Sequence, residues 1–263
     1  MEISLSSRYR SLQKIFSQHR KVAVAFSGGV DSSLLLHVAC ATLGPSRVHA
    51  FHATSELLSP VETERVERTA QGHGCFLHTI EVKPLSWPEF VANHSDRCYH
   101  CKKKIYQTFL TDPLFDKGAA LFDGTNHDDL AQDRPGLRAV SELSVQTPLA
   151  DLGFSKKEVR LLSREFALPT WDAHASSCFA TRIAHQEPIT REKILLVSEC
   201  ESLLQNFGFM GGRVRLCQET ATIAVLQKDL REIQKKQVIS NINASFAFLG
   251  LRKVVIDPQG RSG

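Results

Sequence analysis

The segment with the clearest chemical potential is Phe26-Ser27-Gly28-Gly29-Val30-Asp31-Ser32-Ser33. Two adjacent glycines allow a tight turn in which several backbone N–H groups point the same way. A helix that begins after the turn adds the partial positive charge of its N-terminus, so the segment is suited to bind an anion such as phosphate. No lysine follows the second glycine, which excludes the Gly-Lys-Ser/Thr loop, and the dinucleotide fingerprint is absent too. A plain turn with a helix N-cap is the alternative interpretation.

The cysteines form a second chemical group. Cys98-Tyr-His-Cys101 is a CxxC pair, a pattern shared by zinc sites, redox motifs and iron–sulfur sites. No second CxxC or His pair follows, and Cys178 is the best remaining candidate for a third ligand. Three thiolates without a fourth protein ligand suit a [4Fe–4S] cluster with one open iron. The other four cysteines lie in apolar or helical runs and are expected to be buried packing residues: Cys40, Cys75, Cys200 and Cys217.

Alternating strand-like and helix-like segments must position these groups. Apolar runs predict strands at 21–26, 47–53, 75–82 and 119–123. Helical patterns lie at 11–20, 31–42, 60–72 and 98–110. This alternation predicts an α/β fold with a doubly wound parallel sheet and the glycine loop at the end of its first strand. Residues 124–148 have a loop-like composition, and the capping box Ser155-Lys-Lys-Glu158 predicts a helix over 156–167.

The remainder of the chain predicts a smaller α+β domain. A helix is expected at 190–207, strands at 213–217, 220–226 and 251–256, and a Lys-rich helix at 228–237. We therefore expect a large domain over residues 1–186 and a small domain over 187–263.

Composition sets limits on the class of protein. The 263 residues are 42% hydrophobic and 23% charged, which excludes a disordered or fibrous chain. A net charge of +4 favours anionic ligands but lacks the dense basic stripe typical of nucleic-acid binding, so nucleic acid is not the expected partner. The sequence has no secretory signal and no run of about 20 apolar residues, and we expect a cytoplasmic protein in a reducing environment with no membrane partner.

The glycine loop resembles the SGGxDS loop of the PP-loop ATP pyrophosphatases. In that superfamily the loop holds the departing pyrophosphate, usually with Mg²⁺, while AMP passes to an oxygen of a second substrate. The resemblance implies these roles for Ser27, Gly28, Gly29, Asp31 and Ser32. It also places the adenine of ATP at Ala53 and Ser55, which follow the second predicted strand.

Three further stretches are similar to the LarE family: Asp123 to Arg138, Thr147 to Phe154, and Ala175 to Ile183. The similarity extends over nearly all of residues 10–257. LarE proteins are ATP-dependent sulfur transferases that build a nickel-pincer cofactor. The resemblance implies adenylation of a carboxylate of pyridinium-3,5-biscarboxylic acid mononucleotide, followed by conversion to a thiocarboxylate with sulfur from sulfide or another donor. It also implies a homo-oligomer.

One branch of the family sacrifices the sulfur of a single cysteine, which matches Cys178, and another binds an iron–sulfur cluster. Cys98 and Cys101 place this sequence in the second branch, which implies that the three cysteines hold a [4Fe–4S] cluster and that sulfur travels on its open iron. The resemblance makes Cys178, Asp31 and Arg182 the expected catalytic residues.

Other family positions carry charged side chains. The expected lining of the active site is Gly124, Asp128, Asp129, Asp133, Arg134 and Arg138, and the resemblance implies that Gly124, Asp129 and Arg134 bind ATP. The expected ligands of the substrate phosphate are Arg213, Arg215 and Arg261, with Glu201 as a matching acidic residue. The alternative interpretation of the first group is a solvated charged loop. The alternative for the arginines is the solvent-exposed face of a strand. The run Ala221-Thr-Ile-Ala224 departs from the family, because an arginine and a glutamate are absent there.

Three other functions fit parts of this pattern. A cluster-dependent enzyme that thiolates tRNA also uses an SGGxDS loop with cysteine pairs, and an ammonia-using amide synthetase uses the loop without iron. A nucleotide-binding protein without catalysis is the third alternative.

Overall fold

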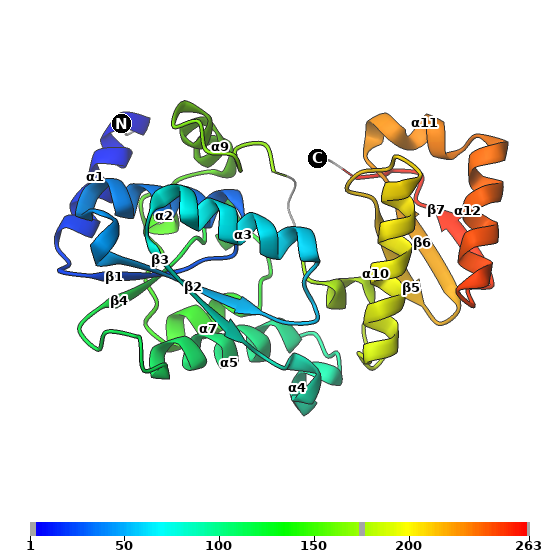
Figure 1. The fold of residues 1–263 in the computed structure, drawn as a ribbon, viewed down its shortest axis with the longest axis horizontal. Coiled ribbons are helices and arrows are strands. Elements are labelled where there is room, and N and C mark those ends of the chain that lie inside the picture. Colours follow the sequence, from blue (N-terminus) through cyan, green and yellow to red (C-terminus); the bar gives the residue numbers. More distant parts are fainter. Residues whose placement is uncertain (1–3, 174–176, 262–263) are drawn as a thin grey trace. The chain divides into compact units, whose positions relative to one another are not determined.

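The computed structural model describes residues 4–173 and 177–261 (Figure 1). The chain divides into two compact units, Met1–Lys83 with Ser95–Ala173 and Pro84–His94 with His174–Gly263. Each unit has its own sheet and is described by itself.

The large unit contains a four-stranded parallel sheet in the order β3-β2-β1-β4. Its strands are β1 (Val22–Ala25), β2 (Val48–Thr54), β3 (Phe76–Glu81) and β4 (Ala120–Asp123). Helices α2 (Val30–Leu43) and α3 (Pro60–His73) cover one face, and α5 (Arg97–Thr111) and α7 (Gly136–Glu142) cover the other (Figure 1). The predicted doubly wound α/β fold is confirmed.

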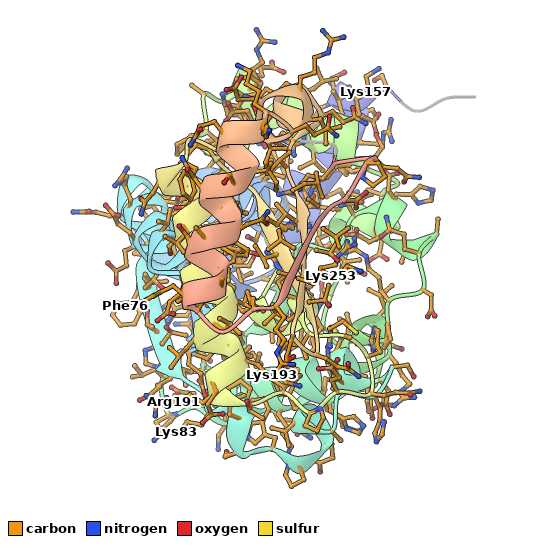
Figure 2. The ribbon with its side chains drawn as sticks, turned by 90° about the vertical axis from the view of Figure 1, so that its right-hand side faces the viewer. Phe76, Lys83, Lys157, Arg191, Lys193 and Lys253 are labelled. Atoms are coloured by element: carbon orange, nitrogen blue, oxygen red, sulfur yellow. The ribbon has the colours of Figure 1, made fainter. Side chains whose placement is uncertain are left out.

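Side chains of β1 alternate between two buried clusters. Val22 and Val24 pack with α2, whereas Ala23 and Ala25 pack on the face covered by α5. Helix α2 is buried nearly all round because α1 (Leu5–Ser17) and α9 (Lys156–Glu165) pack on its outer side. Strand β3 is an edge strand, and its Phe76 is half exposed (Figure 2).

The prediction that 124–148 is a loop is wrong. This region contains α6 (His127–Leu130) and α7, and α8 (Pro148–Asp151) starts at its end. These helices are too short to show an apolar period, and α6 depends on a capping box in which Asn126 accepts hydrogen bonds from the N–H groups of Asp128 and Asp129.

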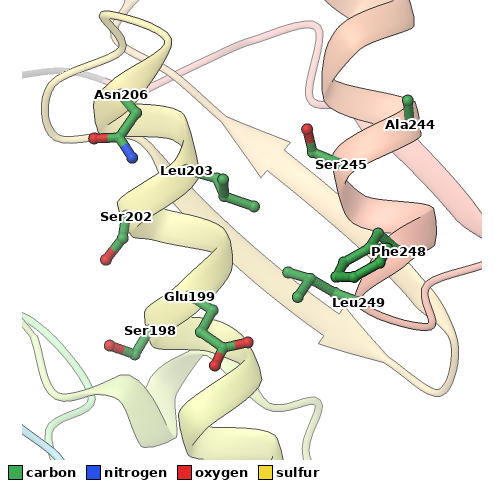
Figure 3. A pocket seen from close by; sticks show the side chains of 9 residues that line it. All are labelled: Ser198, Glu199, Ser202, Leu203, Asn206, Ala244, Ser245, Phe248 and Leu249. Carbon is green, nitrogen blue, oxygen red and sulfur yellow. The ribbon is translucent and has the colours of Figure 1, made fainter.

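The small unit has a three-stranded sheet of β5 (Arg213–Cys217), β6 (Thr220–Ala224) and β7 (Lys253–Ile256). Strands β5 and β6 form an antiparallel hairpin, and β7 pairs parallel to β6. Helix α10 (Arg191–Asn206) packs against β5 and α12 (Lys236–Phe248) against β7, with a groove of about 620 Å³ between the two helices (Figure 3).

The predicted Lys-rich helix at 228–237 is wrong in extent. Residues 228–229 belong to a 3-10 turn (Gln227–Asp229), α11 covers Leu230–Ile233, and α12 already begins at Lys236. Lys235 has extended backbone with ψ 133°, which separates α11 from α12.

The small unit also includes a segment from the middle of the chain. Residues 84–94 contain α4 (Pro88–Val91), and the side chain of Asn93 donates to the carbonyls of Ala184 at 2.8 Å and Glu187 at 2.7 Å. The Ile189 N–H donates to the Val91 carbonyl at 2.9 Å. These bonds explain why residues 84–94 belong to the small unit. The units divide at 83/84, 94/95 and 173/174, whereas the sequence predicted a single boundary after residue 186. Within the residues described, no helix is long and apolar enough to cross a membrane.

Candidate active site

The glycine loop joins the end of β1 to the start of α2, as predicted. Ser27 and Ser32 close it, because their Oγ atoms are 3.1 Å apart and the Ser27 N–H donates to Ser32 Oγ at 3.3 Å. The Ser32 hydroxyl also donates to the Gly29 carbonyl at 3.2 Å. The loop therefore lies at the N-terminus of a long buried helix, where backbone donors and the helix dipole favour an anion.

Two glycines in this region have no room for a side chain. Gly28 has φ +70°, and a Cβ there would lie 2.6 Å from Val66 Cγ2 on α3. A Cβ on Gly124 would lie 2.8 Å from the Ser32 backbone nitrogen. The segment after β4 thus packs directly against the backbone at the start of α2.

Asp31, in the first turn of α2, has two partners from distant parts of the chain. Asn126 Nδ2 donates to Asp31 Oδ1 at 3.0 Å, and Lys156 Nζ forms an ion pair with Asp31 Oδ2. Neither partner was predicted as a site residue. A signal for Lys156 existed, because a lysine at the first position of a helix opposes the helix dipole and so needs another reason to be there.

The charged residues between β4 and α8 lie in two places, one near the glycine loop and the other against α5. Near the loop, Asp129 pairs with Arg134 at 2.8 Å, and Asp128 Oδ2 accepts from the Lys156 N–H at 2.8 Å. Arg138 instead lies over the Tyr99 ring on α5, with its guanidinium carbon 3.4 Å from the ring centroid. Asp133 is exposed.

The carboxyl end of β2 lies beside this loop in the sheet. Ala53 and Ser55 are partly exposed at that end, and Ser55 Oγ accepts from the Leu57 N–H at 3.3 Å. His52 is buried, and its Nδ1 donates to the Phe26 carbonyl at 2.8 Å. Burial lowers the pKa of His52, which favours a neutral ring. Strand order reverses at β1, and ligands of open α/β sheets bind at such a point.

Cys98 and Cys101 lie one turn apart near the start of α5. Cys98 is exposed and Cys101 is partly exposed, so both thiols are accessible. Cys178 belongs to the small unit, where it precedes the 3-10 turn Phe179–Arg182. Among residues 4–173 and 177–261, no three His, Cys, Asp or Glu side chains form a group that could hold a metal ion.

The other cysteines only partly follow the prediction. Cys40 and Cys200 are buried as predicted. Cys75 is only partly buried, and Cys217 is exposed because it lies on the outward face of β5, so the prediction is wrong for Cys217.

In the small unit, Arg182 and Glu201 form a buried ion pair of 2.8 Å, and the Val214 N–H donates to the same carboxylate at 3.1 Å. Arg213 and Arg261 are near this pair. Burial, followed by the charges of Arg261 and Arg182, lowers the pKa of Arg213 to about 10.

Burial and the charge of Arg182 likewise lower the pKa of Arg261. An anion bound beside these three arginines would reduce their mutual repulsion. Arg215 is exposed, as expected for the wet face of β5. None of the predicted site residues lines the groove between α10 and α12 (Figure 3).

A loop of glycines and serines after the first strand of a parallel sheet, at the point where strand order reverses, is the arrangement of the PP-loop class of ATP-using proteins. A sequence profile of the asparagine synthase family matches residues 9–108. An uncharacterized protein of Synechocystis sp. is 33% identical over 97% of this chain and 95% of its own length. The pyridinium-3,5-bisthiocarboxylic acid mononucleotide synthase of Lactiplantibacillus plantarum is 31% identical over 99% of this chain and 94% of its own length. The chain belongs to the LarE family, and it is an enzyme that acts on ATP.

Proposed function

We propose that this enzyme adenylates a carboxylate of pyridinium-3,5-biscarboxylic acid mononucleotide and converts it to a thiocarboxylate. The observation that carries this proposal is the serine-closed loop with Asp31 held between Asn126 and Lys156, in a chain similar along its whole length to a synthase of the bisthiocarboxylic product. The same site explains a need for ATP, because a free carboxylate is a poor electrophile and adenylation gives it a leaving group.

The first step forms an acyl adenylate. A carboxylate oxygen attacks the α-phosphorus of ATP, and the bond to the oxygen of the β-phosphate breaks to release pyrophosphate. In this proposal the N–H groups of the loop, the N-terminus of α2 and the Lys156 ammonium stabilise that departing anion. The carboxylate of Asp31 would hold Mg²⁺, which would neutralise phosphate charge when bound.

In the second step, sulfide attacks the carbonyl carbon and AMP leaves, which gives the thiocarboxylate. In the large unit Cys98 is exposed and Cys101 is partly exposed, and Cys178 is the expected third residue of the sulfur chemistry. The CxxC pair fits two ligands of a [4Fe–4S] cluster, but the described residues do not form a three-ligand group. We therefore propose the three cysteines as cluster ligands only.

The substrate phosphate is proposed to bind in the small unit. Burial there lowers the pKa of Arg213 and of Arg261, so both guanidinium groups gain from a bound dianion. Arg182 is already held by Glu201 and is proposed to support the other two arginines.

The test is an anaerobic assay that separates AMP from ADP and follows pyrophosphate. ATP and sulfide are combined with the pyridinium mononucleotide, with tRNA, or with aspartate and ammonium. We expect AMP, pyrophosphate and a thiocarboxylate only with the mononucleotide. Thiolated tRNA, an amide product, or ADP in place of AMP would contradict the proposal.

Ligation by the cysteines is tested separately by iron and acid-labile sulfide analysis of anaerobically purified protein. Cys98→Ala is expected to lose the bound iron, whereas Cys217→Ala, which removes an exposed thiol outside the proposed set, is expected to retain it. Equal iron in both variants would contradict the ligand assignment.

A further inference from the structure

The carboxylate of Asp123 is buried at the end of β4 and has partners on both sides. Asp123 is 7% exposed, and it accepts hydrogen bonds from Lys102 Nζ at 3.1 Å, from the Thr125 N–H at 2.7 Å, and from the hydroxyls of Tyr106 and Thr125. Burial alone would raise the pKa of Asp123, but Lys102 and the hydroxyl donors outweigh it and lower the pKa. Asp123 is therefore charged at neutral pH, and its charge depends on these partners.

Two of the partners of Asp123, Lys102 and Tyr106, belong to α5, the helix that carries the cysteine pair. Lys102 directly follows Cys101, and Tyr106 lies one turn further along α5 and is buried. The same turn of α5 is packed closely on α7, because a Cβ on Gly136 would lie 3.6 Å from the Cys98 carbonyl.

On the other side, Asp123 adjoins the phosphate loop. It pairs in the sheet with Ala25, the last residue of β1 before the loop. Gly124, the next residue, packs on the backbone of Ser32, and Asn126 donates to Asp31. A single buried carboxylate thus lies between the cysteine turn of α5 and the loop, within one unit of the protein.

We infer that Asp123 is a positioning residue that fixes the Cys98–Cys101 turn relative to the phosphate loop, so that sulfur reaches the carboxylate activated there. This inference rests on the proposed function. It predicts that loss of the Asp123 carboxylate impairs the sulfur step more than the adenylation step.

The test measures thiocarboxylate formed per pyrophosphate released. Asp123→Asn is expected to lower this ratio by about 10- to 100-fold, since misplacement by about 1 Å costs rate on that order. Partial unfolding would reduce both products equally and leave the ratio unchanged. Asp116→Asn is the control, because Asp116 is also a paired carboxylate of the large unit, with Lys21 at 3.4 Å, but lies on the surface. An unchanged ratio in Asp123→Asn would overturn the inference.

Tyr106→Phe provides a second variant, because it removes one donor to Asp123 and keeps the ring in the core. We expect its ratio to fall between those of the wild type and Asp123→Asn. A ratio equal to that of the wild type in both variants would overturn the inference.

Hydrogen exchange separates this inference from the proposed function. In the wild type, Mg-ATP is expected to slow exchange in residues 27–35 and also in 97–106, and in Asp123→Asn only in 27–35. Equal protection of 97–106 in both proteins would overturn the inference even if thiocarboxylate forms. Protection of neither segment in the wild type would overturn the proposed function itself and the inference with it.

Discussion

Gly28 and Lys156 act on the same end of α2, one by having no side chain and the other through its charge. Gly28 turns the chain with φ +70°, and Lys156 brings an ammonium group to Asp31. The donors of the loop are largely backbone N–H groups, so we expect its conformation to govern the affinity for ATP. In the proposed reaction the ammonium group lies near the charge that develops as pyrophosphate leaves, so we expect it to govern the rate.

Gly28→Ala should weaken both the fold and ATP binding. The left-handed backbone and the contact with Val66 Cγ2 at 2.6 Å together should cost about 1–3 kcal/mol of unfolding free energy. Gly74→Ala is the matched control, since Gly74 has φ +66° and nothing within 4 Å of its added Cβ. Urea unfolding and calorimetric ATP titration measure the two effects. Equal losses of stability and affinity in both variants would contradict the role of the contact with α3.

Lys156→Met should slow pyrophosphate release by about 10- to 100-fold, the order expected when one donor to a developing anion is lost. Lys157→Met is the control, because Lys157 is exposed and is the next residue of the same helix (Figure 2). Its rate should stay within about twofold of the wild type. Steady-state release of pyrophosphate under saturating ATP measures both. A Lys156→Met enzyme as fast as the control would remove Lys156 from the mechanism.

Elements with strong local signals were predictable from the sequence. The apolar run before the glycine loop became β1, and Ser155-Lys-Lys-Glu158 formed the expected capping box at the start of α9. Elements that depend on tertiary contacts were missed. Helix α12 begins only after the extended residue Lys235. The short helices after β4 are stabilised by caps and packing, and their sequences show no apolar period from which they could be predicted.

The same limit applies to the candidate site. The loop residues Ser27, Gly28 and Ser32 were predictable because one continuous segment contains both the turn and the helix start. Lys156 and Asn126 reach Asp31 from 125 and 95 residues away along the sequence. Only the folded chain brings such residues together, so the spacing of residues within a short segment cannot predict these contacts.

The 3-10 turn Phe179–Arg182 is joined to α10 and β5 through the Arg182–Glu201 ion pair. Glu201→Gln should destabilise the small unit by about 3 kcal/mol, because it leaves a buried guanidinium without its counter-charge. Glu232→Gln is the control, since the Glu232–Lys235 pair is more than half exposed and such pairs contribute less than about 1 kcal/mol.

The two tryptophans allow the small unit to be followed by itself. Trp87 lies in the small unit and Trp171 in the large one. In a Trp171→Phe background, fluorescence during urea unfolding therefore reports the small unit. Equal midpoints for Glu201→Gln and Glu232→Gln would show that the buried pair contributes no more than the exposed one.

At the scale of the whole molecule, the chain leaves the large unit, contributes residues 84–94 to the small unit, and then returns. A linear reading of the sequence expects one boundary and assigns such a segment to the large domain. The hydrogen bonds of Asn93 and Val91 show why the fold differs, because they connect this segment to backbone groups about 90 residues later. The small unit consequently needs both parts of the chain.

Asn93 tests this arrangement, because it is fully buried and has φ +57°. Asn93→Ala removes two hydrogen bonds to carbonyls and places alanine in the left-handed region, so the small unit should lose about 2–4 kcal/mol of unfolding free energy. Asn93→Gly loses the same bonds but tolerates the backbone, so it should be about 1 kcal/mol less destabilised than Asn93→Ala. Trp87 fluorescence in the Trp171→Phe background measures both. If neither variant shifts the Trp87 transition, residues 84–94 do not stabilise the small unit.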